Sequence, residues 1–261
     1  MSTQNEEREA KLREIAKKQV VLQLPGMDAV FVRSDTYGDL PMDIYYPSQP
    51  QPGDRLPMVV FAFGFPDPEG QIRQYGPMTS WARLIAVSGM AVVLYGSRQP
   101  AEDIHAVLAH LRANAAALNL DGHRIGLFAE SGSGPVALSA LMRDTALRCA
   151  ALLCGYTMDL PGSTAVAGVA SEYGFANACV GKSVDDLPAG VPTFIVRAGR
   201  EQFPGLNPAL DALVAAMIAR NLPLTFVNHA PGAHGFEFDE DTDVSRQIVQ
   251  DVLRFLVKSL A

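Results

Sequence analysis

Cysteine is scarce in this sequence. The chain has 261 residues and only three cysteines, Cys149, Cys154 and Cys179, and their spacing matches no metal-binding pattern. An odd and sparse set of this kind is typical of reduced thiols in a cytoplasmic protein, so we expect no bound metal.

Runs of basic residues and long apolar segments are also missing. The formal net charge is −7, which argues against nucleic acid as a partner. No apolar run approaches the ~20 residues that a membrane-spanning helix needs. Residues 1–19 are charged and lack the apolar region of a secretory signal. We therefore expect a cytoplasmic protein with neither a nucleic-acid nor a membrane partner.

Apolar residues, in contrast, make up 48% of the chain, which is typical of a well-buried globular protein. The length suits one large domain, and we see no linker or internal repeat. We predict an N-terminal helix over residues 1–18 and a single domain over residues 19–261. That helix mixes acids and bases and is expected to be solvated; packing on a second copy, as a homodimer, is the alternative.

Short apolar runs alternate with segments of helical periodicity along the chain. The predicted strands cover residues 20–24, 29–33, 40–46, 58–63, 90–95, 125–129, 149–154, 191–198 and 224–228. The predicted helices cover residues 79–88, 102–118, 135–147, 208–218 and 244–260. This alternation predicts an α/β fold whose sheet is mostly parallel, with antiparallel strands near the N-terminus. Asn207 is expected to cap the helix that begins at Pro208. Residues 156–188 have little periodicity, so any cap over a site is expected to be small.

Residues 124–138, RIGLFAESGSGPVAL, contain the strongest functional signal. An apolar strand leads into a cluster of small residues around Ser131, and a helical pattern starts at Pro135. A serine at a sharp turn from strand to helix is exposed as a nucleophile. Ser133 is the rival, but a nucleophile there would place Pro135 in the turn.

A serine hydroxyl needs a base that accepts its proton, and such groups gather at the carboxyl ends of the strands. His234 lies in HAPGAHGFEF, between the last predicted strand and the closing helix. The glycine-rich loop would let this imidazole reach Ser131, so we prefer it to His229, which ends the strand itself.

The remaining requirements are a carboxylate that orients the base and donors for the oxyanion. Glu201 directly follows the strand predicted over residues 191–198, whereas the alternatives, Asp185 and Asp186, do not. The backbone N–H groups of Gly132, after the nucleophile, and of Phe65, in the loop FAFGFPDP, are the expected oxyanion donors.

These motifs resemble the α/β-hydrolase superfamily, in particular compact esterases related to the dienelactone hydrolases. The likeness extends from about Leu40 onward and rests on the FAFGF loop, the AESGSG elbow, and the RAGRE and AHGF segments. It implies an α/β-hydrolase fold with helices on both faces of the sheet and a minimal or absent cap domain. It also implies a serine esterase without a cofactor, with Ser131 as nucleophile, His234 as base and Glu201 as the acid of the triad.

The chain departs from the family pattern at several positions. Ala129 and Ser133 replace the two glycines of the usual G-x-S-x-G elbow, and Glu201 replaces the commoner aspartate. Phe63 stands where related esterases often carry a histidine, and the elbow lacks the cysteine nucleophile of dienelactone hydrolases proper. An amidase or peptidase on the same triad, and a ligand-binding protein without turnover, are the alternative functions.

Aromatic residues near these loops are candidates for a pocket that holds a small ester or lactone. The expected substrate-binding residues are Tyr75, Trp81, Tyr95 and Phe203, although core packing explains several of them equally well. Glu130 precedes the nucleophile, where some carboxylesterases also carry an acid. It is expected either to form a hydrogen bond beneath the elbow or to be structural.

Overall fold

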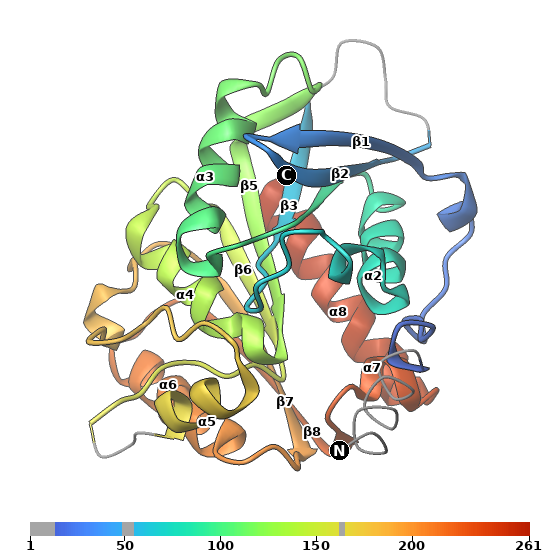
Figure 1. Ribbon diagram of the computed structural model, residues 1–261. Helices are drawn as coiled ribbons and strands as arrows, with labels where there is room; N and C mark the ends of the chain where they lie inside the picture. The colour runs from blue at the N-terminus through green and yellow to red at the C-terminus, as the bar shows by residue number, and fades with distance from the viewer. Residues whose placement is uncertain (1–13, 49–54, 162–164) are drawn as a thin grey trace, which may run out of the picture.

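The computed structural model describes residues 14–48, 55–161 and 165–261, which contain one eight-stranded sheet (Figure 1). The spatial order of the strands is β1-β2-β4-β3-β5-β6-β7-β8. Their bounds are β1 Phe31–Tyr37, β2 Leu40–Tyr46, β3 Leu56–Phe61, β4 Ala91–Tyr95, β5 Leu120–Glu130, β6 Cys149–Leu153, β7 Thr193–Arg200 and β8 Leu224–Ala233. β2 pairs antiparallel with β1 and with β4, and the other neighbouring strands run parallel. The mostly parallel sheet with antiparallel strands near the N-terminus is therefore confirmed.

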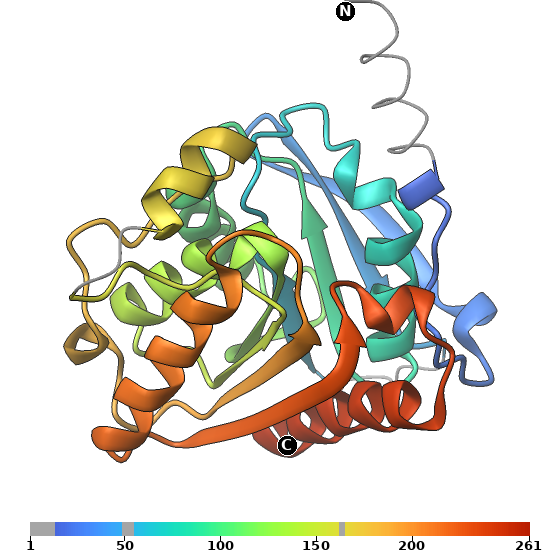
Figure 2. The same ribbon diagram turned by 90° about the horizontal axis from the view of Figure 1, so that it is seen from below.

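Helices cover both faces of this sheet (Figures 1 and 2). Their bounds are α2 Gly76–Ala86, α3 Pro100–Ala113, α4 Gly134–Arg143, α5 Ala165–Tyr173, α6 Leu206–Ala219, α7 Phe236–Asp239 and α8 Asp243–Leu260. On β5, Gly126 faces Leu260 of α8 and Phe128 packs on Trp81 of α2, so these two helices share one face. Helices α3 and α4 pack against each other and on the opposite face of β5. β4 and β6 are buried along their whole length, as expected for strands covered on both sides.

The N-terminal part differs from the sequence prediction. Residues 20–24 form no strand, because the N–H of Val20 donates to Ser80 Oγ and that of Val21 to the carbonyl oxygen of Glu237. The strand predicted over residues 29–33 begins at Phe31 instead. The helix predicted over residues 1–18 lies largely outside the described residues. None of the helices in the described part of the chain is long and apolar enough to cross a membrane.

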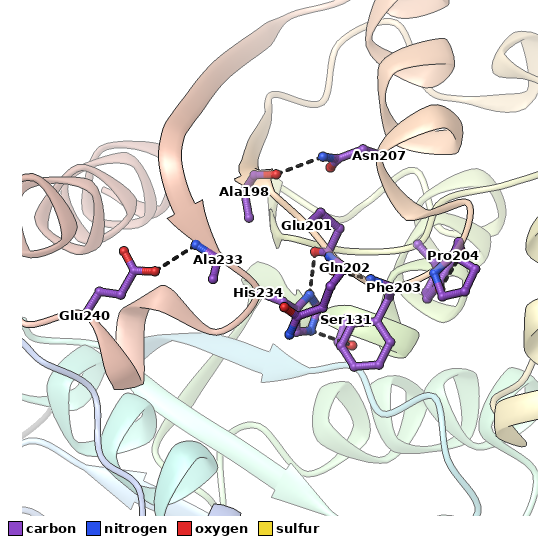
Figure 3. A network of polar contacts seen from close by, with 11 residues as sticks. Ser131, Ala198, Glu201, Gln202, Phe203, Pro204, Asn207, Ala233, His234 and Glu240 are labelled. Atoms are coloured by element: carbon purple, nitrogen blue, oxygen red, sulfur yellow. Dashed lines mark hydrogen bonds and ion pairs between the residues drawn. The ribbon is translucent and has the colours of Figure 1, made fainter.

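Helix α6 also begins differently from the prediction. Gly205, with φ of 72°, is its N-cap, so Asn207 and Pro208 lie inside the first turn. The side chain of Asn207 does not cap the helix; its Nδ2 donates to the carbonyl oxygen of Ala198 at 2.8 Å. A polar side chain that suits a cap is used here to join the end of β7 to α6 (Figure 3). Farther upstream, residues 156–188 contain a helix that the sequence pattern did not predict, α5.

Candidate active site

Ser131 lies at a sharp turn between β5 and α4. Its φ of 50° is in the left-handed region, where a non-glycine residue costs of the order of 1–3 kcal/mol and where functional residues cluster. The carbonyl oxygen of Ser131 accepts a hydrogen bond from the N–H of Tyr156 at 3.0 Å. A Cβ at Gly134 would overlap the carbonyl oxygen of Tyr156, so only glycine fits there. The small residues around Ser131 are thus required by the close approach of this backbone segment.

Three side chains from separate elements form a continuous hydrogen-bonded line at the carboxyl edge of the sheet. His234, which follows β8, places Nε2 at 3.1 Å from Ser131 Oγ. Its Nδ1 lies 2.6 Å from Oε2 of Glu201, which follows β7 (Figure 3). The structure therefore brings together the three residues that the sequence pattern singled out, with the imidazole between the hydroxyl and the carboxylate.

The carboxylate of Glu201 is almost completely buried and fully hydrogen-bonded. Its side chain is 1% exposed, and Oε1 accepts the backbone N–H groups of Gln202 and Phe203, each at 2.9 Å. Burial by itself raises the pKa of Glu201, but the hydrogen bond and charge of His234 and the two N–H groups together lower it below its ordinary value. Glu201 thus stays ionised at neutral pH and fixes the orientation of the imidazole.

The rival nucleophile, Ser133, has a different role in the structure. It is buried, and its Oγ accepts the N–H of Gly64 at 3.0 Å. This bond ties the loop after β3 to the elbow. No hydrogen bond joins Ser133 to His234 among the described residues.

The other candidates for base and acid lie away from Ser131. His229 is buried in β8 and packs edge-on against Phe236. Asp185 and Asp186 belong to a short 3-10 helix, Val184–Asp186, where Asp186 accepts the N–H of Ser183. Neither of these two carboxylates makes a hydrogen bond to an imidazole in the described part of the chain.

The loop after β3 packs directly on the elbow, where the two oxyanion donors were expected. A Cβ at Gly64 would overlap the carbonyl group of Gly132. The rings of Phe65 and Phe175 lie about 3 Å from where a Cβ on Gly132 would be. The N–H of Phe65 has no acceptor among the described residues. Both expected donors therefore belong to segments that lie against Ser131, and that of Phe65 is free to bind a ligand.

A pocket of about 460 Å³ opens beside Ser131 and His234. Of the four aromatic residues proposed as its lining, Tyr75 and Phe203 belong to the wall, and the Phe203 ring packs edge-on against His234 with centroids 4.6 Å apart. Trp81 and Tyr95 do not. They are 0% and 1% exposed and pack in the core, so their assignment to the substrate pocket is wrong.

Sequence reasoning also missed part of the wall. Glu237 lines the pocket from α7, only three positions after His234, and Pro77 and Met78 line it from α2. Glu237 stands inside the quoted segment HAPGAHGFEF, where an acid so close to the base was a usable signal. Within the described ranges, no group of three His, Cys, Asp or Glu side chains is placed to hold a metal ion.

Comparison with known proteins gives a fold but no close relative. No family model and no curated protein sequence matches the chain. Among solved structures, the thermophilic esterase Est2 of Thermogutta terrifontis is 19% identical, with a TM-score of 0.67 over 90% of this chain and 94% of that one. A thermostable esterase from Pseudomonas putida is 14% identical, with a TM-score of 0.69 over 92% and 86% of the two chains. One of two fungal esterases from Rhizomucor miehei is 16% identical, with a TM-score of 0.67 over 90% and 84%. The chain has the α/β-hydrolase fold.

Proposed function

We propose that this chain is a serine hydrolase that cleaves a carboxylic ester or lactone through an acyl-enzyme and without a cofactor. The observation that carries this proposal is the line from Ser131 Oγ through His234 to Glu201, with spacings of 3.1 and 2.6 Å. A nucleophile, a base and an orienting acid within hydrogen-bond reach are what activation of a serine requires. The strained backbone at Ser131 adds to this support.

In the first step, Ser131 Oγ attacks the ester carbonyl carbon while His234 Nε2 accepts the hydroxyl proton. Glu201 accepts the Nδ1–H of the same ring. It thereby keeps the tautomer whose Nε2 lone pair faces the serine and stabilises the imidazolium that forms. The negative charge on the carbonyl oxygen is stabilised by the N–H groups of Phe65 and Gly132.

The tetrahedral intermediate then collapses to the acyl-enzyme. His234 gives its proton to the leaving alcohol, and a water molecule enters. The same imidazole takes a proton from this water as the water attacks the acyl carbonyl carbon. When this second tetrahedral intermediate collapses, His234 returns the proton to Ser131 Oγ and the acid product leaves.

Two further observations support a small ester or lactone as the substrate. The similar solved structures are described as esterases, although identities below 20% carry the fold alone to this chain. The pocket beside Ser131 is mostly apolar, with Tyr75 and Phe203 on its wall, which suits the acyl or alcohol part of a small ester. The likeness to dienelactone hydrolases in particular rests on sequence motifs.

Hydrolysis of p-nitrophenyl acetate by matched serine variants tests the proposal. We expect Ser131→Ala to lose turnover by about 10⁴-fold or more, whereas Ser133→Ala keeps it within about tenfold because it removes only the acceptor for Gly64. Equal turnover in wild type and Ser131→Ala would contradict the proposal. A panel of esters, lactones and amides then ranks the substrate classes, and a preference for amides would favour the amidase alternative.

A further inference from the structure

The peptide group that joins Gly64 to Phe65 is held by a segment from a distant part of the chain. Its carbonyl oxygen, on Gly64, accepts the N–H of Ala176 at 2.7 Å. Ala176 follows α5, in the connection between β6 and β7. The N–H of Gly64 donates to Ser133 Oγ at 3.0 Å. Gly64 is thus fixed on both sides, by the elbow through its N–H and by Ala176 through its carbonyl oxygen.

The bond from Ala176 determines the direction of the Phe65 N–H. This peptide is trans, since the described residues contain no cis peptide bond. In a planar trans peptide the C=O and the N–H point in opposite directions. A carbonyl oxygen on Gly64 that faces Ala176 therefore turns the Phe65 N–H to the opposite side, where it has no acceptor among the described residues. The Ala176 bond thus sets which way the expected oxyanion donor faces.

Phe175 holds the same segment against the elbow. Gly174, with φ of 81°, ends α5 in the left-handed conformation, and its N–H donates to the carbonyl oxygen of Ala170 at 2.9 Å. The next side chain, Phe175, is 5% exposed, and its ring lies 3.1 Å from where a Cβ on Gly132 would be. The ring also stacks on Tyr156, with centroids 5.0 Å apart. Phe175 therefore packs on the residue that supplies the second expected donor.

We propose that Phe175 and Ala176, together the 175–176 clamp, are positioning residues that orient the oxyanion donors of Phe65 and Gly132. The N–H of Ala176 fixes the peptide plane that carries the Phe65 N–H. The Phe175 ring lies against Gly132 and edge-on to the Phe65 ring, with centroids 6.1 Å apart. Donors held in this way need no reorganisation when charge develops on the substrate oxygen. The proposal rests on the hydrolase function proposed above, because it assigns the orientation of the donors and not the reaction.

Exchange of one backbone amide for an ester tests the clamp most sharply. Lactic acid in place of Ala176 removes the N–H and keeps the methyl group, so the carbonyl oxygen of Gly64 loses its donor. We expect kcat for p-nitrophenyl acetate to fall by about 10–100-fold with KM within about threefold, because a misdirected donor weakens only the bond to the oxyanion. Leucic acid in place of Leu187 is the matched control, since it removes a similar bond, to the carbonyl oxygen of Val184. A kcat that does not fall below that of this control would overturn the proposal.

A trifluoromethyl ketone separates binding of the oxyanion from ordinary binding. Ser131 Oγ adds to its carbonyl carbon, His234 accepts the hydroxyl proton, and the carbonyl electron pair moves to the oxygen, which takes the oxyanion position. The corresponding methyl ketone binds without this addition. We expect the Ala176 exchange to weaken the trifluoromethyl ketone by about tenfold or more and the methyl ketone by less than about threefold. Equal weakening of both ketones would indicate a general loosening of the pocket and would contradict the clamp.

Side-chain variants test the part played by Phe175. Phe175→Ala is expected to lower kcat by about tenfold or more, and Phe175→Leu, which refills most of the space, is expected to recover most of this loss. Phe194→Ala is the matched control: Phe194 is 3% exposed at the amino end of β7 and packs on Phe255, away from the elbow. A loss of kcat as large in Phe194→Ala as in Phe175→Ala would show that lost stability is the cause, and the proposal would fail.

Amide hydrogen exchange separates the clamp from the hydrolase function, because it needs no turnover. We expect faster exchange in residues 62–66 of Phe175→Ala than of the wild type, and no change there in Phe194→Ala. This result in a protein that turns over no ester would keep the clamp and remove the hydrolase. Ester turnover that stays at full kcat in both the Ala176 exchange and Phe175→Ala would keep the hydrolase and contradict the clamp.

Discussion

Two sets of buried carboxyl groups flank Ser131, and they behave in opposite ways. Glu201 has a donor at each oxygen, from two backbone N–H groups and His234, and its pKa is lowered. Glu130 and Glu237 each keep one oxygen without a donor, and their pKa values are raised. Burial is common to both sets, so fixed donors determine which carboxyl stays charged. The fold supplies such donors to the group that orients the base, whereas one oxygen of Glu130 and one of Glu237 are buried without a donor of normal geometry.

The largest expected effect comes from replacing the carboxylate of Glu201, which has a hydrogen-bond donor at each oxygen. Glu201→Gln keeps an oxygen for the N–H groups of Gln202 and Phe203 but turns an amide donor toward His234 Nδ1. The ring then adopts the tautomer with a proton on Nε2, which cannot accept the proton of Ser131. We expect kcat to fall by about 10⁴-fold.

Steady-state hydrolysis of p-nitrophenyl acetate measures this loss, with Glu102→Gln on the exposed surface as control. A kcat within tenfold of the wild type in Glu201→Gln would mean that Glu201 is not the orienting acid.

A smaller effect is expected from the loop that packs on the elbow and presents Phe65. In Gly64→Ala, the new Cβ would overlap the carbonyl group of Gly132, and both partners are backbone. The loop must move off the elbow and the oxyanion loses a donor, so we expect kcat to fall by about 10²–10³-fold. Gly168→Ala on α5, where nothing lies within 4 Å, is the matched control. If Gly64→Ala melts as the wild type does and keeps full kcat, Phe65 is not a donor.

The raised pKa of Glu237 should be measurable in the pH dependence of the free energy of unfolding. Folded Glu237 keeps its proton up to about pH 7, whereas the unfolded chain loses it near pH 4.3. Its contribution is therefore complete below about pH 4 and is lost as the pH rises through 7. From pH 5 to pH 8, the free energy of unfolding should fall in the wild type by of the order of 2 kcal/mol more than in Glu237→Gln.

Urea denaturation at the two pH values measures this difference. Parallel pH profiles for wild type and Glu237→Gln would show that the pKa of Glu237 is not raised in the folded state.

The smallest effect concerns the scaffold beneath Glu201. Asn207→Ala removes the bond from Nδ2 to the carbonyl oxygen of Ala198, which joins β7 to α6. We expect a loss of about 1 kcal/mol in the free energy of unfolding, with kcat within threefold of the wild type. A large loss of kcat at unchanged stability would show that this bond positions Glu201 directly.

The line of Ser131, His234 and Glu201 could be predicted from the sequence, whereas the meeting of Glu130 and Glu237 could not. Ser131, Glu201 and His234 each follow a predicted strand, and parallel strands bring their carboxyl ends to one edge. Their separation along the chain is therefore no obstacle. Glu130 ends β5 and Glu237 lies on α7, and no periodicity in the sequence predicts a helix of four residues.

Other misses have local physical reasons. Trp81 and Tyr95 lie near the predicted site in sequence, but the face of α2 and of β4 on which each stands is buried. Asn207 suits a helix cap, yet Gly205 with its positive φ ends the loop two residues earlier. Residues 20–24 have the pattern of a strand, but the N–H groups of Val20 and Val21 donate to acceptors on α2 and α7 instead of to a neighbouring strand. In each case tertiary contacts override a local preference.

Covalent labelling tests the central claim most directly. A fluorophosphonate probe reacts with a serine that is activated by a neighbouring base, and mass spectrometry of the digested protein locates the adduct. The account predicts one adduct on Ser131, none on Ser133, and a strongly reduced rate of labelling in His234→Ala. Folded wild-type protein that remains unlabelled at Ser131 would contradict it.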